Sequence, residues 1–197
     1  MPIMNPRATI WTVPNIISIY RLLALPAIVA ALAGGHRGWF AGLIVANLVS
    51  DILDGILARV LRQQTELGAR LDSMGDLGTY ILALAGLIVF EREFIAGHLI
   101  EIGLLIGFFM AAELISLARF RRPVSMHLYS SKIAGYAQGI FFAAIFLFGY
   151  FPALFYIMLA ICLINNAEEI AILFIVPESR TDARGLYWVM KSLKPKG

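Results

Sequence analysis

The chain has 197 residues, of which 60% are hydrophobic and only 15% are charged, and its mean hydropathy is +0.81. Soluble globular domains contain about 45–50% apolar and about 25% charged residues, so this composition excludes an ordinary soluble domain and predicts a membrane protein. The formal net charge is +3, and the single cysteine, Cys162, excludes a disulfide bond within the chain.

Apolar stretches long enough to span a bilayer, about 20 residues each, recur along the chain. Six can be drawn, at approximately Pro14 to Ala33, Trp39 to Val60, Leu71 to Phe90, Ala96 to Ala118, Ile133 to Tyr150 and Ala153 to Val176. The first lacks the cleavage site of a signal peptide and is followed by further spans, so we interpret it as a retained helix. The pattern predicts an all-α membrane protein with six transmembrane helices in a single domain, residues 1–197.

Lysine and arginine gather in the loops on one side of these spans. They occur at Arg7, at residues 59–70 and 119–132, and in the tail at residues 178–197. The opposite loops receive only Arg37 and Arg92. Because basic loops stay in the cytoplasm, we expect both termini there. The first dozen residues, with Trp11, are typical of a short interfacial helix or of a disordered start. The basic tail is a topology signal that also attracts anionic lipid, and it gives no case for binding nucleic acid.

Four aspartates lie at the cytoplasmic ends of the second and third spans, where a membrane protein rarely places charge. Asp51 and Asp54 are three residues apart, and Asp72 and Asp76 are four apart, so each pair shares one helix face. The short loop between the spans makes them antiparallel neighbours, and we expect the four carboxylates to converge. Hard oxygen ligands in this number suit Mg²⁺, Mn²⁺ or Ca²⁺, and such sites serve phosphoryl chemistry.

Neighbouring residues allow more than one interpretation. Arg59 and Arg62 could hold a phosphate. Gly55, Ala58 and Gly68 are small where a ligand could approach the backbone, or where helices pack closely. The aspartates could instead form structural bridges with arginines, or bind ions for transport.

The spacing D-x2-D-G-x2-A-R-x8-G-x3-D-x3-D resembles the signature of the CDP-alcohol phosphotransferases, also called CDP-alcohol phosphatidyltransferases. All eight positions are filled, by Asp51, Asp54, Gly55, Ala58, Arg59, Gly68, Asp72 and Asp76. Residues 14–21, PNIISIYR, resemble the opening of that family. Residues 131–138, SKIAGYAQ, resemble a segment of phosphatidylglycerophosphate and cardiolipin synthases, with Gly135 in place of threonine. Residues 71–73, LDS, are nearer to phosphatidylserine and phosphatidylinositol-phosphate synthases.

The resemblance implies a six-helix enzyme of a bacterial-type inner membrane, usually a homodimer, with its active site facing the cytoplasm. Asp51, Asp54 and Asp72 would ligate two divalent ions, Mg²⁺ or Mn²⁺, that hold the diphosphate of CDP-diacylglycerol. Asp76 would complete the metal site and act as general base on an alcohol acceptor, and CMP would be released. The CDP-binding residues would be Asp51, Gly55, Ala58, Arg59 and Gly68.

The acceptor is less defined. We rank glycerol 3-phosphate or phosphatidylglycerol first, with a phosphatidylserine or phosphatidylinositol-phosphate type of acceptor as the alternative. A phosphorylated acceptor would need basic residues, and the candidates are Arg21, Arg119 and Lys132. Arg21 could instead extend to the interface, and the two loop residues could serve topology alone. Further polar residues without a role lie in apolar surroundings: Glu113, Asn165, Asn166, Glu168 and Glu169.

Two other classes of protein deserve comparison with a transferase. An ion transporter built on the carboxylates would be expected to carry inverted repeats and broken helices, and the sequence shows no internal repeat. A catalytically inactive scaffold would be expected to have lost signature residues, whereas all eight are present.

Overall fold

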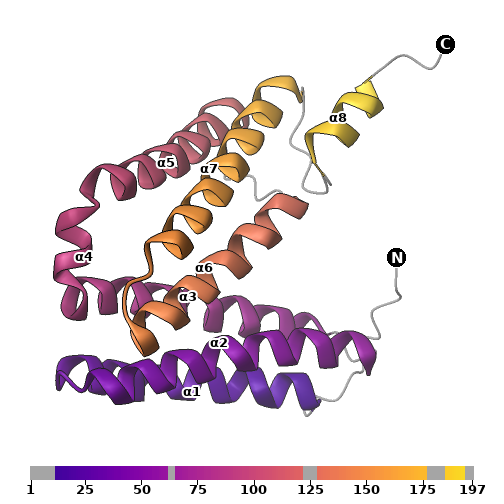
Figure 1. Ribbon diagram of the computed structural model, residues 1–197. Coiled ribbons are helices and arrows are strands. Elements are labelled where there is room, and N and C mark those ends of the chain that lie inside the picture. The colour runs from indigo at the N-terminus through magenta and orange to yellow at the C-terminus, as the bar shows by residue number, and fades with distance from the viewer. Residues whose placement is uncertain (1–11, 62–64, 122–127, 177–184, 194–197) are drawn as a thin grey trace. The chain divides into compact units, whose positions relative to one another are not determined.

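The computed structural model describes residues 12–61, 65–121, 128–176 and 185–193, and every regular element within them is an α-helix. In chain order the helices are α1 (Val13–Ala33), α2 (Arg37–Val60), α3 (Glu66–Phe90), α4 (Arg92–Gly97), α5 (Leu99–Phe120), α6 (Tyr129–Phe148), α7 (Pro152–Ile175) and α8 (Leu186–Leu193) (Figure 1). Six of these, all except α4 and α8, are long and apolar enough to cross a membrane. The predicted all-α fold with six spans is therefore confirmed.

Local sequence signals explain where several helices begin and end. The hydroxyl of Thr12 accepts a hydrogen bond from the backbone N–H of Asn15 (3.3 Å) at the start of α1. Thr65 caps α3 in the same way, accepting from the N–H of Gly68 (2.9 Å). This cap starts α3 at Glu66, five residues before the predicted start of that span. At the ends of α1 and α6, Gly35 (φ 69°) and Gly149 (φ 96°) adopt the left-handed conformation that glycine tolerates best.

The start of the fourth predicted span is interrupted in the structure. It was expected to begin near Ala96, but α4 ends at Gly97 and α5 begins at Leu99. His98 breaks the helix between them, with φ −131° and ψ 31°. Its Nε2 lies 2.7 Å from the hydroxyl of Tyr150, between α6 and α7. Partial loss of water around Tyr150 raises the pKa of its hydroxyl above the ordinary value for tyrosine.

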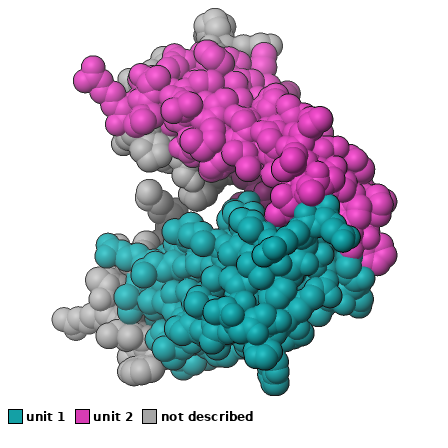
Figure 2. Space-filling model, turned by 90° about the vertical axis from the view of Figure 1, so that its left-hand side faces the viewer, with its two compact units in different colours: residues 1–94, 143–149 teal, residues 95–142, 150–197 magenta. Residues whose placement is uncertain are grey.

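The described chain forms two compact units, which Figure 2 colours separately. Unit 1 comprises Met1–Phe94 and Ala143–Gly149, and contains α1, α2 and α3. The three helices lie side by side (Figure 1). The buried ring of Phe40 on α2 packs edge-on against the ring of Phe146, with 5.1 Å between the ring centres. Helix α3 approaches these two rings at Gly86.

A buried amide ties the three helices of unit 1 together. Asn47 on α2 is fully buried, and its Nδ2 donates to the carbonyl of Arg21 on α1 (3.3 Å) and to the hydroxyl of Thr79 on α3 (3.1 Å). Because an unpaired amide would be costly in this setting, these bonds favour one rotational setting of α1 against α2 and α3. That setting determines which side chains of α1 face the aspartates.

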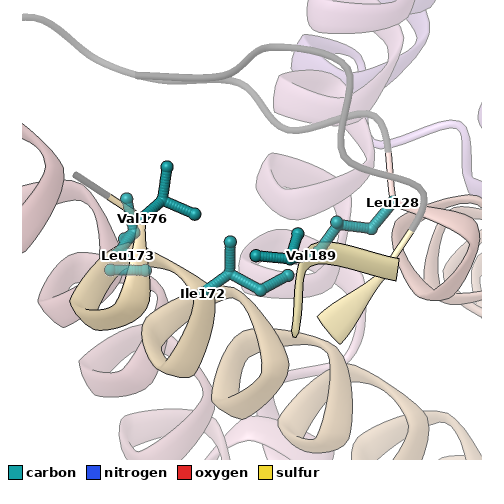
Figure 3. Packing of buried hydrophobic residues seen from close by; sticks show 6 residues of the cluster. Leu128, Ile172, Leu173, Val176 and Val189 are labelled. Carbon is teal, nitrogen blue, oxygen red and sulfur yellow. The ribbon is translucent and has the colours of Figure 1, made fainter. Parts of the chain in front are cut away.

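Unit 2 comprises Ile95–Phe142 and Tyr150–Gly197. A buried apolar cluster in this unit joins α5, α7 and α8 with the residue that precedes α6 (Figure 3). The cluster consists of Ala112, Leu128, Ile172, Leu173, Val176 and Val189. Val189 is the member that belongs to α8, so this short terminal helix is packed onto α7.

Candidate functional site: a carboxylate cluster around Arg21

The four signature aspartates of unit 1 lie together. Asp51 and Asp54 stand near the C-terminal end of α2, and Asp72 and Asp76 near the N-terminal end of α3. Asp51, Asp72 and Asp76 each offer a ligand oxygen, and these atoms lie within 4.8 Å of one another. The convergence expected from their spacing is present in the structure, because two antiparallel helices turn one face of each toward the other.

An arginine from α1 occupies the centre of this cluster. The Nη1 atom of Arg21 lies 2.8 Å from Oδ1 of Asp51 and 2.8 Å from Oδ1 of Asp72. The same atom is 3.7 Å from Oδ2 of Asp54, and Nη2 donates a hydrogen bond to Asp76. The Arg21 side chain is 1% exposed. The interpretation that it extends to the interface is therefore wrong, since its guanidinium is buried against carboxylates.

The four carboxylates differ in their access to solvent. The side chain of Asp54 is 6% exposed, whereas those of Asp51, Asp72 and Asp76 are 37%, 38% and 51% exposed. Asp54 also accepts a hydrogen bond from the hydroxyl of Ser18 on α1 (2.9 Å). Asp54 thus anchors α2 to α1, and the other three present oxygens that a ligand can reach.

The residues at this site fit a divalent cation. Four carboxyl groups face one guanidinium, so the single positive charge of Arg21 cannot balance the cluster when all four are ionised. Carboxylate oxygens are the ligands that Mg²⁺ and Mn²⁺ prefer. Asp51, Asp72 and Asp76 supply such oxygens from two helices, within 4.8 Å of one another.

Sequence reasoning gave no role to Ser18 or Asn15. Both lie in the segment of residues 14–21 that resembles the opening of the family, and both are buried. Ser18 bonds Asp54, and the Oδ1 atom of Asn15 accepts a hydrogen bond from the hydroxyl of Thr65 (3.2 Å). The sequence did hold a signal for them, because they lie in that segment three residues apart, on one face of α1.

The small residues of the signature have different surroundings. A Cβ atom at Gly68 would overlap Oδ1 of Asn15 and come within 2.9 Å of Oγ1 of Thr65. Gly68 is therefore needed for the packing of α1 on α3. A Cβ at Gly55 would meet no atom within 4 Å, so packing does not explain this glycine. Ala58 is half-buried and Arg59 is exposed, both on the last turns of α2.

This contrast predicts opposite effects of two alanine substitutions. Gly68→Ala should destabilise the protein by about 1–3 kcal/mol, because Asn15 must move. Gly55→Ala should stabilise it by about 0.5–1 kcal/mol, since alanine is the better helix former, yet reduce turnover if Gly55 lies against the nucleotide. Thermal unfolding in detergent, measured beside CMP release for both variants, tests this. Equal loss of stability in the two variants would contradict the assignment of Gly68 to packing.

Of the three basic residues predicted for the acceptor, Arg21 lies with the aspartates in unit 1, whereas Arg119 and Lys132 lie in unit 2. Arg119 donates a hydrogen bond to the carbonyl of Leu173, near the end of α7. Nζ of Lys132 lies 5.7 Å from the centre of the Tyr129 ring. The structure thus gives Arg119 a helix-end partner, and a role of either residue in acceptor binding stays a prediction. Arg62 lies outside the described residues.

Polar residues of α7 have structural partners within unit 2. Asn165 accepts from the hydroxyl of Ser131 on α6 (2.8 Å). Glu168 accepts from the backbone N–H of Leu186 (2.8 Å), the first residue of α8. Since the first N–H groups of a helix lack partners within it, Glu168 serves as a cap for α8.

Removal of this cap should loosen α8. In Glu168→Ala we expect a loss of about 1 kcal/mol of local stability, which corresponds to roughly fivefold faster hydrogen exchange of the α8 amides. Exchange measured by mass spectrometry checks this, with Glu169→Ala, the adjacent carboxylate of α7, as the matched control. Unchanged exchange in Glu168→Ala, or equal acceleration in both variants, would show that the cap is unimportant.

Comparison with known proteins gives one family match and several relatives that are similar over part of their sequence. A model of the CDP-alcohol phosphatidyltransferase family matches residues 11–182. A CDP-diacylglycerol–glycerol-3-phosphate 3-phosphatidyltransferase of Cereibacter sphaeroides is 38% identical over 78 residues, which are 38% of this chain and 35% of that protein. Proteins of Mycobacterium bovis and Mycobacterium tuberculosis, provisionally named cardiolipin synthases, are 44% identical over 66 residues, which are 33% of this chain and 32% of theirs. The match thus spans about a third of the length of each relative. No solved structure matches the chain.

Proposed function

Since the chain belongs to the CDP-alcohol phosphatidyltransferase family, we propose that it transfers a phosphatidyl group from CDP-diacylglycerol to an alcohol and releases CMP. The observation that carries this proposal is the convergence of the four signature aspartates on one site. In this reaction the hydroxyl oxygen of the acceptor attacks the phosphorus that bears the diacylglycerol. The bond from that phosphorus to the bridging oxygen breaks, and CMP leaves with the electron pair.

We assign the roles of the aspartates from their exposure and position. Asp51, Asp72 and Asp76 would hold divalent metal through their accessible oxygens, with Asp54 behind them. Bound Mg²⁺ or Mn²⁺ would supply positive charge to the diphosphate oxygens. Asp76 has the most exposed of the four side chains, and it would take the proton of the acceptor hydroxyl. Gly55, Ala58 and Arg59 would contact the CDP group from the end of α2.

For the acceptor we propose glycerol 3-phosphate first, in accordance with the name of the relative from Cereibacter sphaeroides. Phosphatidylglycerol ranks second because two further relatives carry the provisional name of cardiolipin synthase. Serine and inositol phosphate are the alternative, supported by the LDS sequence at residues 71–73.

The test is a turnover assay on the purified full-length chain in lipid nanodiscs. CDP-diacylglycerol and Mg²⁺ or Mn²⁺ are supplied with one acceptor at a time, and CMP release and the lipid product are measured by mass spectrometry. We expect turnover with glycerol 3-phosphate to exceed that with each other acceptor. Turnover with serine or inositol phosphate alone would overturn the assignment of glycerol 3-phosphate as the acceptor. No CMP release with any alcohol would favour a carboxylate-based ion transporter or an inactive scaffold.

We further propose that this integral membrane protein resides in a bacterial-type inner membrane, acts as a single catalytic domain in a homodimer, and opens its site to the cytoplasm. The basic residues near the aspartates, Arg59 and Arg70, support this orientation. Both termini would then be cytoplasmic.

Cysteine labelling tests the orientation, since the native Cys162 is buried. A cysteine at the exposed position Leu61, beside the aspartates, should resist an impermeant thiol reagent in intact spheroplasts. A cysteine at Gly38, where the added side chain meets no atom within 4 Å, should react. The reverse pattern would place the site on the outer side.

A further inference from the structure

The buried guanidinium of Arg21 occupies the oxygens that a metal would need. Its Nη1 atom is 2.8 Å from oxygens of both Asp51 and Asp72, and Nη2 bonds Asp76. These are the same three residues whose ligand oxygens lie within 4.8 Å of one another. We propose that Arg21 is an internal counter-cation that competes with the divalent ion for these carboxylates and must turn aside when the ion binds. This inference rests on the proposed function, because it presupposes a metal site.

The competition follows from charge and hydrogen-bond geometry. A divalent ion in contact with the oxygens of Asp51 and Asp72 would stand close to Nη1, and two positive centres at such a separation repel each other strongly. A carboxylate oxygen also has few lone pairs to share between a planar donor and a metal. The divalent ion concentrates its charge on one small centre, whereas the guanidinium spreads one charge over three nitrogens. Binding of the ion therefore weakens the hold of Arg21.

The surroundings of Arg21 suit a group that moves. Its Nε atom is buried and has no hydrogen-bond partner among the residues that the structure describes, so the guanidinium does not satisfy all its donors in this arrangement. On α3 it lies against Gly75, where even an added Cβ would make only an ordinary van der Waals contact with Cζ, at 3.5 Å, so the backbone of α3 does not clamp the guanidinium. The backbone of Arg21 is fixed by the bond from Asn47 to its carbonyl. The side chain can thus change direction while α1 stays in place.

The competing interpretation is that Arg21 forms a fixed structural bridge. The two interpretations predict opposite changes in metal affinity when Arg21 is removed. If Arg21 competes, its removal relieves a competitor and tightens metal binding. If it only holds the carboxylates in place, its removal disperses them and weakens metal binding. The affinity for Mn²⁺ therefore distinguishes the two without any measurement of turnover.

The experiment compares Mn²⁺ binding by the full chain, Arg21→Gln and Arg21→Lys in nanodiscs, from the electron paramagnetic resonance signal of free Mn²⁺. The matched control is Arg37→Gln, which removes another arginine of unit 1. Arg37 lies at the start of α2, fourteen residues before Asp51, and forms an ion pair with Glu91 (2.7 Å). Couplings between two binding events commonly amount to about 5- to 150-fold, so we expect Arg21→Gln to bind Mn²⁺ about tenfold more tightly than the unmodified chain. Arg37→Gln should bind it with unchanged affinity.

Arg21→Lys keeps a positive charge but cannot bond three carboxylates with a planar fork. Its affinity for Mn²⁺ should therefore lie between that of the unmodified chain and that of Arg21→Gln. If Arg21→Gln does not fold, Arg21→Lys is the deciding variant. Weaker Mn²⁺ binding by Arg21→Lys than by the unmodified chain would overturn the inference. Equal or weaker binding by a folded Arg21→Gln, with normal binding by the unmodified chain, overturns the inference and leaves the proposed function standing. Absence of Mn²⁺ binding in all four chains would overturn both.

Discussion

Replacement of Asp76 by asparagine is expected to abolish turnover while leaving the binding of CDP-diacylglycerol measurable. Asparagine has nearly the same shape and keeps an oxygen that can accept from Nη2 of Arg21, whose bond to Asp76 helps to order the cluster. It cannot accept the proton of the acceptor hydroxyl. General-base catalysis contributes about 10²- to 10⁴-fold, so we expect a loss of kcat in that range or beyond.

Two measurements on the same preparation test the role of Asp76. The first is the rate of CMP release, and the second is equilibrium binding of labelled CDP-diacylglycerol. Ser73→Ala serves as the control, since this exposed hydroxyl of α3 donates to the carbonyl of Ala69 (2.9 Å) and should be dispensable. Full activity of Asp76→Asn would remove the base assignment. Loss of donor binding together with turnover would make Asp76 chiefly a metal ligand.

The convergence of the aspartates could be predicted because it depends on local rules. Spacings of three and four residues place Asp51 with Asp54, and Asp72 with Asp76, on single faces of helices. A short loop then fixes the two helices as antiparallel neighbours. The count of six spans followed in the same way from apolar length alone.

The position of Arg21 could not be predicted in this way. Its partners lie 30 to 55 residues further along the chain, and their contact depends on the rotation of α1 about its axis. That rotation is set by tertiary bonds, such as those of Asn47, which no local pattern encodes. Sequence reasoning therefore considered a phosphate or the membrane interface as partners of Arg21. It allowed bridges between the aspartates and arginines, but it did not identify Arg21 as the arginine that forms them.

Gly68 illustrates a second limit of local patterns. The signature motif marks Gly68 and Gly55 alike, and a small residue suits both ligand approach and helix packing. Only the neighbouring helix separates these cases, because Asn15 of α1 fills the space beside Gly68 and no atom fills that beside Gly55. The break at His98 is similar, since an apolar run continues through it and hydropathy alone did not locate it.

Removal of divalent metal by a chelator is expected to reduce turnover at least a hundredfold and to leave the fold intact. Metal ions contribute several kcal/mol of transition-state stabilisation in such sites, and each 1.36 kcal/mol is about tenfold in rate. The fold should survive because Arg21 neutralises part of the charge on the aspartates, and because the core around Phe40 lies elsewhere in unit 1. CMP release is measured before chelation, after it, and after addition of Mg²⁺ or Mn²⁺, with helix content followed by circular dichroism.

The form of recovery separates metal dependence from a structural effect of the chelator. Full return of turnover with Mg²⁺ or Mn²⁺, at constant helix content, would support a metal site on the carboxylates. Asp51→Asn provides the matched variant, since it removes one ligand charge while Asp54 keeps α2 anchored to Ser18; it should need higher metal concentrations for any recovery. Undiminished turnover in the chelated protein would mean that the pairing of Arg21 with the aspartates is a structural bridge, and that the charge on the diphosphate is neutralised by protein groups alone.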